Sequence, residues 1–254
     1  MIDLHCHVLP GVDDGPPTME GSLALARGAV ARGVRTIVAT PHVSWDMPHN
    51  TAASIAEGVA AVNGALQDAG VPLDVLTGGE VAMSRAGDLE PSELDALRLG
   101  GGPWLLVECP FSPAAGGIEA ILRGLATRGH RILLAHPERS PAFMPAGRLA
   151  AFVETGMLAQ VTATSLTGGF GREVQRVARA FVRDGLAHVI SSDAHDATKR
   201  PPGMREHIER AGFATLADWL TDAMPAAIVA GDPLPPRPEP PEAPRRGLLG
   251  RLRR

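Results

Sequence analysis

The chain has 254 residues, of which 44% are hydrophobic and 20% are charged, the balance of a globular protein with one full core. It contains no run of about 18 apolar residues, which excludes a membrane-spanning helix, and its first residues do not resemble a signal peptide. Its two cysteines, Cys6 and Cys109, exclude a disulfide framework and favour a cytoplasmic location.

Charge is distributed unevenly along the chain. The net charge is −4, but the segment from Asp232 to the end holds three acidic residues and six arginines, so residues 1–231 carry −7. An acidic body argues against nucleic-acid binding and is compatible with a site that concentrates metal cations.

Short apolar segments rich in Val, Ile and Leu alternate with Ala-rich segments of helical pattern. The predicted strands are Ile2–His7, Arg35–Pro41, Leu73–Val81, Trp104–Cys109, Arg131–His136, Leu158–Ala163 and His188–Ser192. The predicted helices cover residues 18–32, 51–69, 91–98, 116–129, 146–155, 170–185 and 203–212. This alternation predicts an α/β domain with a parallel sheet. Seven strands favour a closed or nearly closed barrel, although an open doubly wound sheet would produce the same alternation.

The composition changes after residue 231. Residues 232–244 are rich in proline, which cannot hold a helix or a central strand at this density. We therefore expect one domain over residues 1–231 and a disordered tail over 232–254. Residues 245–254 interleave leucine with arginine, as a solvated tail does. Weak contact with an anionic membrane surface or an acidic partner is the alternative for this basic end.

Six of the seven predicted strands end in residues that bind metal ions. These residues, with one from the loop after the first strand, are His5, His7, Asp14, His42, Glu80, Glu108, His136, Asp193 and His195. Alternate side chains of a strand share a face, so His5 and His7 point the same way, as do Asp193 and His195. Because the carboxyl ends of parallel strands meet at one face, we expect one shared pocket. The sixth strand, near Thr162, contributes no ligand.

Each of these residue types also has a structural interpretation. We assign no function to the histidines away from the strand ends, His49, His130, His188 and His207. Asp13 and Asp14 precede a glycine and are also typical of a turn. Glu80 and Glu108 are harder to explain structurally, because a carboxylate buried at the end of an apolar strand is costly unless it is paired or bound to metal.

The ligand types indicate the metal and the substrate. Imidazole and carboxylate without thiolate suit Mn, Fe or Zn in a catalytic site. Nine ligands holding three divalent cations, with four carboxylates among them, would leave a charge of about +2, which favours hydroxide and a phosphate dianion. Arg139 and Arg200 would add bidentate recognition of phosphate, with surface ion pairs as the alternative. The cluster predicts a phosphoester hydrolase.

The motifs together resemble one family. The run from His5 to Pro16, HCHVLPGVDDGP, resembles the start of the polymerase-and-histidinol-phosphatase (PHP) superfamily. Within it, the chain is similar to the bacterial tyrosine-protein phosphatases of capsule and exopolysaccharide operons, the CpsB/YwqE type. The matching motifs, in chain order, are Thr40-Pro41-His42, Gly79-Glu80, Glu108, His136-Pro137-Glu138-Arg139 and Ser192-Asp193-Ala194-His195. The resemblance covers residues 1–231.

The resemblance implies a distorted (β/α)7 TIM-like barrel, the PHP fold, with three divalent metal ions that are usually Mn²⁺. It implies one ion on His5, His7, Glu80 and Asp193, a second on Glu80, Glu108 and His136, and a third on Asp14, His42 and His195. Arg139 and Arg200 would bind phosphate, and Asp193 or a metal-bound water is a candidate proton donor.

The resemblance therefore implies a metal-dependent protein-tyrosine phosphatase that acts through a metal-activated hydroxide. Its partner would be a phosphotyrosine-bearing protein, a bacterial tyrosine kinase of polysaccharide synthesis. The chain has no tyrosine, so it is not its own substrate, and neither Cys6 nor Cys109 begins the Cys-x5-Arg motif of a phosphocysteine mechanism. The alternatives are a small-molecule phosphomonoesterase, such as a histidinol-phosphate phosphatase, and a non-catalytic metal-binding scaffold.

Overall fold

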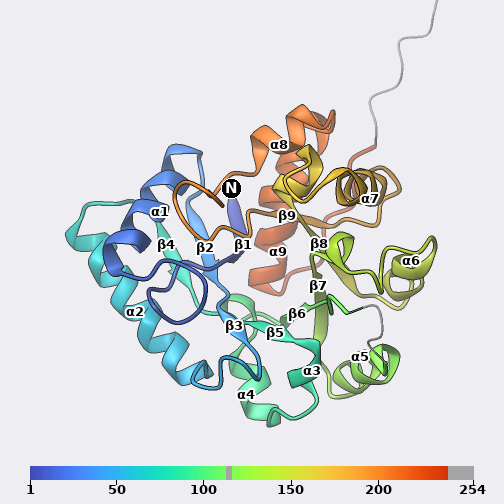
Figure 1. Cartoon of the computed structure of the whole chain (residues 1–254), viewed down its shortest axis with the longest axis horizontal. Coiled ribbons are helices and arrows are strands. Elements are labelled where there is room, and N and C mark those ends of the chain that lie inside the picture. The colour runs from blue at the N-terminus through green and yellow to red at the C-terminus, as the bar shows by residue number, and fades with distance from the viewer. Residues whose placement is uncertain (113–115, 240–254) are drawn as a thin grey trace, which may run out of the picture.

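The structure, a computed structural model, describes residues 1–112 and 116–239 and consists of parallel strands surrounded by helices (Figure 1). A three-stranded sheet has the order β1 (Ile2–Cys6), β2 (Thr36–Ala39), β4 (Asp74–Leu76). A six-stranded sheet has the order β3 (His42–Val43), β5 (Glu80–Ala82), β6 (Trp104–Glu108), β7 (Arg131–Ala135), β8 (Leu158–Thr162), β9 (Val189–Ser191). Every ladder is parallel, which confirms the predicted α/β class.

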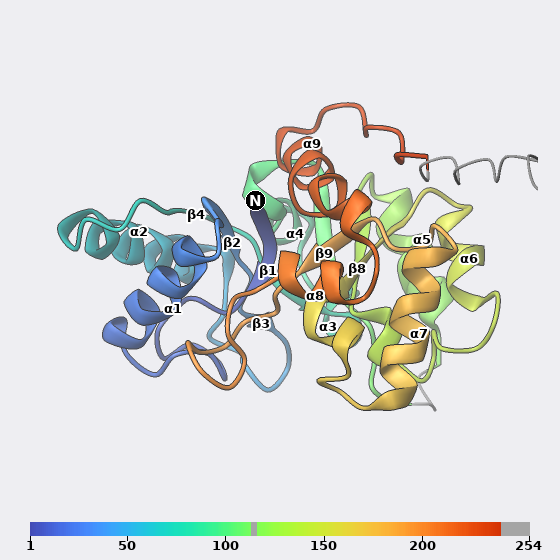
Figure 2. The same ribbon diagram turned by 90° about the horizontal axis from the view of Figure 1, so that it is seen from above.

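The helices lie outside the sheets. They are α1 (Met19–Ala31), α2 (Ala52–Asp68), α3 (Met83–Ala86), α4 (Pro91–Ala96), α5 (Ile118–Thr127), α6 (Arg148–Val153), α7 (Arg172–Arg183), α8 (Arg205–Arg210) and α9 (Met224–Ala230). Both α1 and α2 flank the small sheet, whereas α5, α6 and α7 flank the larger one (Figures 1 and 2). Thr18 caps α1, and Thr51 and Ser54 form a capping box on α2. In the described ranges, no helix is both long and apolar enough to cross a membrane.

All seven predicted helices are confirmed, but the short α3 and α9 were not predicted. For α9 the reason lies in the sequence. Its segment contains Pro225, which interrupts the helical pattern of the sequence. The turn before α9, Trp219–Ala223, is π-helical, and a π turn widens the helix just before the proline. The apolar side chains of Met224 and Ile228 are buried, so packing against the core holds a helix that local propensity alone does not predict.

The predicted strand Leu73–Val81 is divided by Gly78 and Gly79 into β4 and β5. A further short strand, β3, begins at His42, directly after the predicted strand Arg35–Pro41, and Pro41, which has no N–H for a ladder, lies between β2 and β3. A Cβ on Gly78 would lie 2.7 Å from Val38 Cγ1, so only glycine allows this close approach. The described residues therefore form nine strands in two sheets, in place of the single seven-stranded sheet expected from the sequence.

The two sheets meet along β1 and the segment that follows β9. Cys6 and Ala194 form a parallel bridge, His7 N donates to Ala194 O at 2.9 Å, and Asp193 N donates to His5 O at 2.9 Å. The fully buried Asp3 strengthens this junction, because its Oδ1 accepts a hydrogen bond from Ser192 N at 3.0 Å. Residues almost 190 positions apart in sequence are thus fixed side by side.

The chain after residue 231 follows the surface of the domain. Trp219 Nε1 donates to Pro235 O at 3.1 Å, and Arg237 Nη2 donates to Val182 O at 2.6 Å. The described part of the predicted tail, residues 232–239, thus contacts the domain through two hydrogen bonds to backbone oxygens. Residues 240–254, which include the basic end for which contact with an anionic surface was the alternative, lie outside the described residues.

His188, just before β9, gives a prediction on stability. Its Nδ1 accepts a hydrogen bond from Ala159 N at 3.2 Å, and burial together with Arg237 lowers its pKa to about 4. An unfolded histidine has a pKa of about 6.5, so between pH 6.5 and 4 the unfolded chain binds a proton that the folded chain does not. The contribution of His188 to the free energy of unfolding is complete above about pH 6.5 and is lost as the pH falls toward the folded pKa of about 4.

We therefore expect the free energy of unfolding to fall when the pH is lowered from 7 to 5, and to fall by about 1 kcal/mol more in the wild type than in His188→Gln. This value allows for the partial exposure of the ring, which weakens the effect. Urea titrations at both pH values measure this difference. His49→Gln, at an exposed histidine, is the control and should behave as the wild type. The same pH dependence in all three proteins would contradict the prediction.

Candidate metal centre

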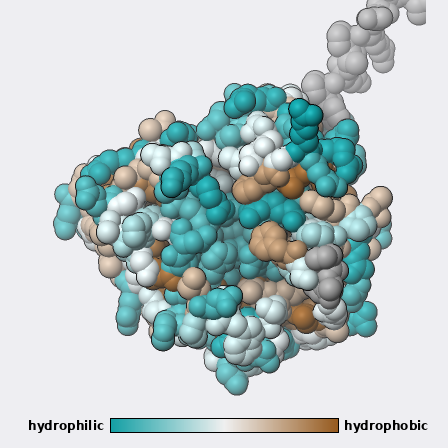
Figure 3. Space-filling view, viewed as in Figure 1, coloured by the Kyte–Doolittle hydropathy of each residue, from teal (hydrophilic) through white to brown (hydrophobic). Residues whose placement is uncertain are grey.

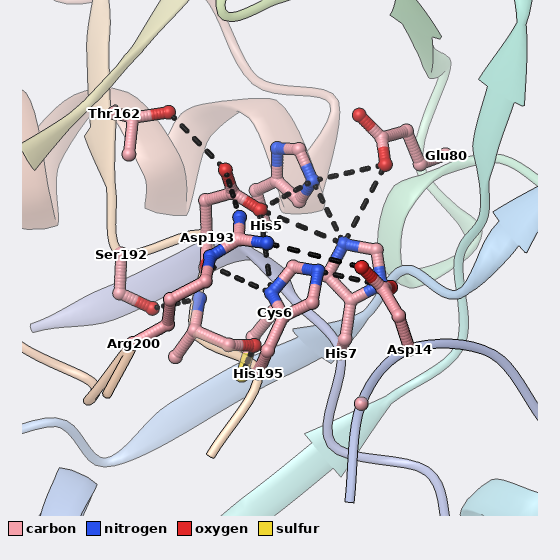
Figure 4. A network of polar contacts seen from close by, with 12 residues as sticks. His5, Cys6, His7, Asp14, Glu80, Thr162, Ser192, Asp193, His195 and Arg200 are labelled. Carbon is pink, nitrogen blue, oxygen red and sulfur yellow. Dashed lines mark hydrogen bonds and ion pairs between the residues drawn. The ribbon is translucent and has the colours of Figure 1, made fainter. Parts of the chain in front are cut away.

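The nine predicted ligands converge at the carboxyl ends of the strands. Figure 4 shows His5, His7, Asp14, Glu80, Asp193 and His195 pointing toward one another. They fall into four groups, and within each group the potential ligand atoms lie within 4.8 Å of one another. The groups are His7, Asp14, His42 and His195; His5, His7 and Asp193; His5, Glu80 and His136; and His42, Glu80 and Glu108. Shared members connect all four groups, so the structure forms one continuous cluster of imidazoles and carboxylates.

Glu80 lies at the centre of this cluster and is 1% exposed. Its Oε1 is 2.8 Å from His136 Nε2, and its Oε2 is 2.9 Å from His42 Nδ1 and 3.3 Å from His5 Nε2. Burial acts to raise the pKa of this carboxyl, but the surrounding histidines outweigh it and hold the pKa well below the usual range. A carboxylate that belongs to two of the groups is placed to bridge cations.

Glu108 ends β6 beside Glu80. Burial and the negative charge of Glu80 raise the pKa of Glu108 to about 7, so without a cation this carboxyl holds a proton near neutral pH. The structure groups Glu108 with His42 and Glu80, and it groups His136 with His5 and Glu80. The resemblance instead implies that Glu108 and His136 share an ion. In the structure both residues lie near Glu80: His136 contacts its Oε1, whereas Glu108 belongs to the group that contains His42.

The third part of the cluster surrounds Asp14, in the loop after β1. Asp14 Oδ1 is 3.1 Å from His195 Nε2 and 3.4 Å from His42 Nε2, and its side chain is 56% exposed. Burial acts to lower the pKa of His42, but contacts with Asp14 and Glu80 raise it to about 11. In the absence of a cation His42 therefore holds a proton at neutral pH, and a divalent cation would compete with that proton for the nitrogen lone pair.

The residues present fit divalent metal ions. His136 Nδ1 is buried, and the described residues supply it with no hydrogen bond, as expected of an atom that turns its lone pair toward a cation. The neighbours of the buried Glu80 Oε2 are the imidazole nitrogens of His5 and His42, which are themselves candidate ligands. The donor set is imidazole and carboxylate. Cys6 and Cys109 are fully buried, and burial raises the pKa of both thiols, so they are apolar core residues as predicted.

Backbone strain is concentrated at two of these ligands. Among the described non-glycine residues, only His136 and Asp193 have positive φ, at 33° and 52°. Such conformations cost on the order of 1–3 kcal/mol each and persist where surrounding structure imposes them. Each follows a strand of the large sheet and turns its side chain into the cluster (for Asp193, Figure 4). The strain indicates a functional position.

The two predicted phosphate-binding arginines meet at Asp193. Arg139 Nη1 lies 2.5 Å and Arg200 Nη2 lies 2.7 Å from Asp193 Oδ2, while Asp193 Oδ1 is 3.5 Å from His5 Nε2. Burial acts to raise the pKa of Asp193, but His5 and Arg200 hold it below its usual range. A carboxyl with so low a pKa is a poor proton donor, so the geometry favours Asp193 as a ligand and an anchor for the arginines.

Two residues that orient ligands were missed in the sequence. Asp13 Oδ2 lies 2.7 Å from His7 Nδ1 and accepts a hydrogen bond from His42 N at 3.1 Å. Gln160 Oε1 lies 3.1 Å from His5 Nδ1 and accepts from His136 N at 3.2 Å. Such partners fix the tautomer and the direction of ligating histidines.

Asp13 resembled a turn residue, and it does form the turn, since its Oδ1 accepts from Gly15 N at 2.9 Å. Gln160 lies on β8, the strand expected to contribute no ligand. The available signal was a glutamine in an otherwise apolar, fully buried strand, where its amide needs partners.

Comparison with known proteins identifies the family of the chain. The family model for capsular polysaccharide synthesis, CpsB/CapC, matches residues 1–212. The tyrosine-protein phosphatase YwqE of Bacillus subtilis (strain 168) is 34% identical over 201 residues, 79% of each chain. The tyrosine-protein phosphatase CpsB of Streptococcus pneumoniae is 29% identical over 214 residues, 81% of this chain and 87% of that protein.

A solved structure shares the fold. It comes from crystal structures of YwqE from Bacillus subtilis and CpsB from Streptococcus pneumoniae, unique metal-dependent tyrosine phosphatases. The superposition has a TM-score of 0.81 at 30% sequence identity and covers 94% of this chain and 100% of the other. With a family model that matches most of its length and relatives that match over about four-fifths of it, the chain belongs to the CpsB/CapC family of capsular polysaccharide synthesis.

Proposed function

We propose that this chain is a metal-dependent protein-tyrosine phosphatase. The observation that carries the proposal is the single cluster of nine imidazole and carboxylate ligands with two arginines at its edge. A cluster of cations beside two guanidinium groups suits a phosphate dianion. The relatives are named tyrosine-protein phosphatases, and the solved structure comes from metal-dependent tyrosine phosphatases.

We infer that the cluster holds three divalent ions, with Mn²⁺ preferred and Fe or Zn as alternatives. Bound cations of this kind supply a nucleophile at neutral pH and offset the negative charge of the phosphoryl group. Arg139 and Arg200 then donate hydrogen bonds to phosphate oxygens and stabilise the charge that builds up during transfer. The phenolate of tyrosine has a pKa of about 10, so it leaves with less help from an acid than an alkoxide needs.

We also infer that the two sheets act together as the distorted seven-stranded barrel of the PHP fold. The pairing of Thr36 with Asp74 and of His42 with Glu80 has the same offset, so the register continues across the break between the sheets. The bridge between Cys6 and Ala194 would close the ring. Such a ring places every strand end around one pocket.

For its partner we propose a bacterial tyrosine kinase of capsule or exopolysaccharide synthesis. The support is the family, whose description is capsular polysaccharide synthesis, and the names of the phosphatase relatives. A kinase that carries phosphotyrosine would meet this chain in the cytoplasm, a location that suits the two free cysteines. The acidic charge of residues 1–231 does not favour nucleic acid as a substrate.

Metal reconstitution tests the function. Enzyme stripped of metal should lose activity on a phosphotyrosyl peptide by about 10³-fold, and Mn²⁺ should restore more activity than Fe²⁺, Zn²⁺ or Mg²⁺ added separately. Histidinol phosphate is the competing substrate. If the enzyme hydrolysed histidinol phosphate efficiently and did not hydrolyse the peptide, the chain would be a small-molecule phosphatase and not a protein phosphatase.

A further inference from the structure

An exposed aromatic side chain lies directly beside the metal cluster. Phe111, in the loop after β6, is 49% exposed, and its ring stacks nearly parallel on the ring of His136, with 5.5 Å between centroids and 16° between planes. Ser140 Oγ donates to Pro110 O at 2.5 Å and ties this loop to the segment that carries His136. Phe111 therefore presents a half-exposed aromatic surface at the edge of the ligand cluster.

A second phenylalanine lies on the neighbouring loop. Phe170 is in the turn between β8 and α7, between Gly168 and Gly171, whose φ angles of 94° and 93° suit glycine. Gly169 N donates to Thr164 O at 3.0 Å and Gly171 N donates to Gly168 O at 3.0 Å, so the turn is defined by its own hydrogen bonds. The turn presents Phe170 toward the cluster, because the Arg139 guanidinium carbon lies 4.3 Å from the ring centroid.

Arg139 connects the two rings. Its guanidinium carbon is also 5.2 Å from the centroid of Phe111, while its Nη1 reaches Asp193. The guanidinium therefore contacts two phenyl rings and the candidate ligand Asp193 at the same time. In the space-filling view, apolar residues border the central hydrophilic area of this face on the side of β7 and β8 (Figure 3).

We propose that Phe111 and Phe170 bind the phenyl ring of phosphotyrosine and set the preference for aryl over alkyl phosphates; this rests on the proposed function. Because the Arg139 guanidinium lies against both rings, the ester group of a phosphate bound by this arginine would lie close to them. A tyrosyl ring in that place packs against Phe111 and Phe170, whereas the short side chain of phosphoserine does not reach them. An aromatic pair adds about 0.5–1.5 kcal/mol to binding, which is about two- to twelvefold in affinity.

The test separates binding of the ring from binding of the phosphate. KM for a phosphotyrosyl peptide reports both, and the inhibition constant of inorganic phosphate reports the metal and arginine site alone. We expect Phe111→Ala to raise KM about fivefold and Phe111→Ala with Phe170→Ala to raise it about twentyfold, while the inhibition constant of phosphate changes less than about twofold. Phe111→Tyr should restore KM, and Leu234→Ala, at an exposed apolar residue, is the control.

Each outcome has one meaning. Equal rises in KM and in the phosphate inhibition constant would show that the rings only support His136 and Arg139, which overturns the proposal. An unchanged KM in the double variant also overturns it. If the wild type bound phosphate but did not hydrolyse the peptide, the proposed function itself would be wrong. Metal content, measured on each variant, shows whether the ligand cluster remained intact.

Discussion

Replacing Glu80 by glutamine should lower kcat/KM on a phosphotyrosyl peptide by about 10³- to 10⁴-fold. Glu80 belongs to two of the ligand groups, and its two oxygens contact different histidines. Glutamine keeps the shape of the side chain but removes its negative charge and turns an NH2 group toward one of the sites. We therefore expect metal analysis of the purified variant to show the loss of at least one ion per chain.

Glu138→Gln is the matched control. Glu138 is as buried as Glu80, but its Oε1 accepts hydrogen bonds from Ser165 Oγ at 2.7 Å and Thr162 N at 3.0 Å, and it belongs to none of the ligand groups. The control should keep its metal and change chiefly in stability. A Glu80→Gln variant with full metal content and activity would contradict the central place of this residue. A wild type that binds fewer than about two ions per chain would favour the non-catalytic scaffold.

The candidate ligands could be predicted because of a simple regularity. A polar, metal-binding residue at the end of an apolar strand is unusual, and parallel strands bring such ends together. His136 and Glu108, far apart in sequence, were predicted as neighbours of one pocket on this ground, and both lie against Glu80. The seven predicted helices were visible for a similar reason, since each has its own apolar pattern and follows a predicted strand.

What the sequence did not reveal depends on tertiary contacts. Asp13 is a turn residue by local pattern, and only the fold places its second oxygen on His7. Gln160 acts from a strand without ligands because β8 lies between the strands that carry other members of the cluster. The division of the predicted strand Leu73–Val81 depends on the close packing of Gly78 against Val38, which no local pattern encodes.

The second large effect is expected at Arg200. Its Nη2 lies 2.7 Å from Asp193 Oδ2, and its backbone oxygen accepts a hydrogen bond from His195 N at 3.0 Å, so the residue is fixed against two ligands of the cluster. Arg200→Lys keeps the positive charge but loses the planar fork that matches two phosphate oxygens. We expect kcat/KM on the phosphotyrosyl peptide to fall about 10²-fold, with metal content unchanged.

Arg35→Lys provides the matched control, because Arg35 pairs with Asp222 on the exposed surface, where such a pair adds little. Its activity should stay within about twofold of the wild type. If Arg200→Lys also stayed within that range, Arg200 would be a structural partner of Asp193 and not a phosphate ligand.

Combining Arg139→Lys with Arg200→Lys adds a further test. Both guanidinium groups contact the same oxygen of Asp193, so each keeps the other's anchor in place before substrate arrives. Holding two donors in position in advance lowers the entropy that phosphate binding must overcome. Because the two arginines share one anchor, the loss in the double variant should differ from the product of the single losses, and kcat/KM of the four proteins measures that coupling directly.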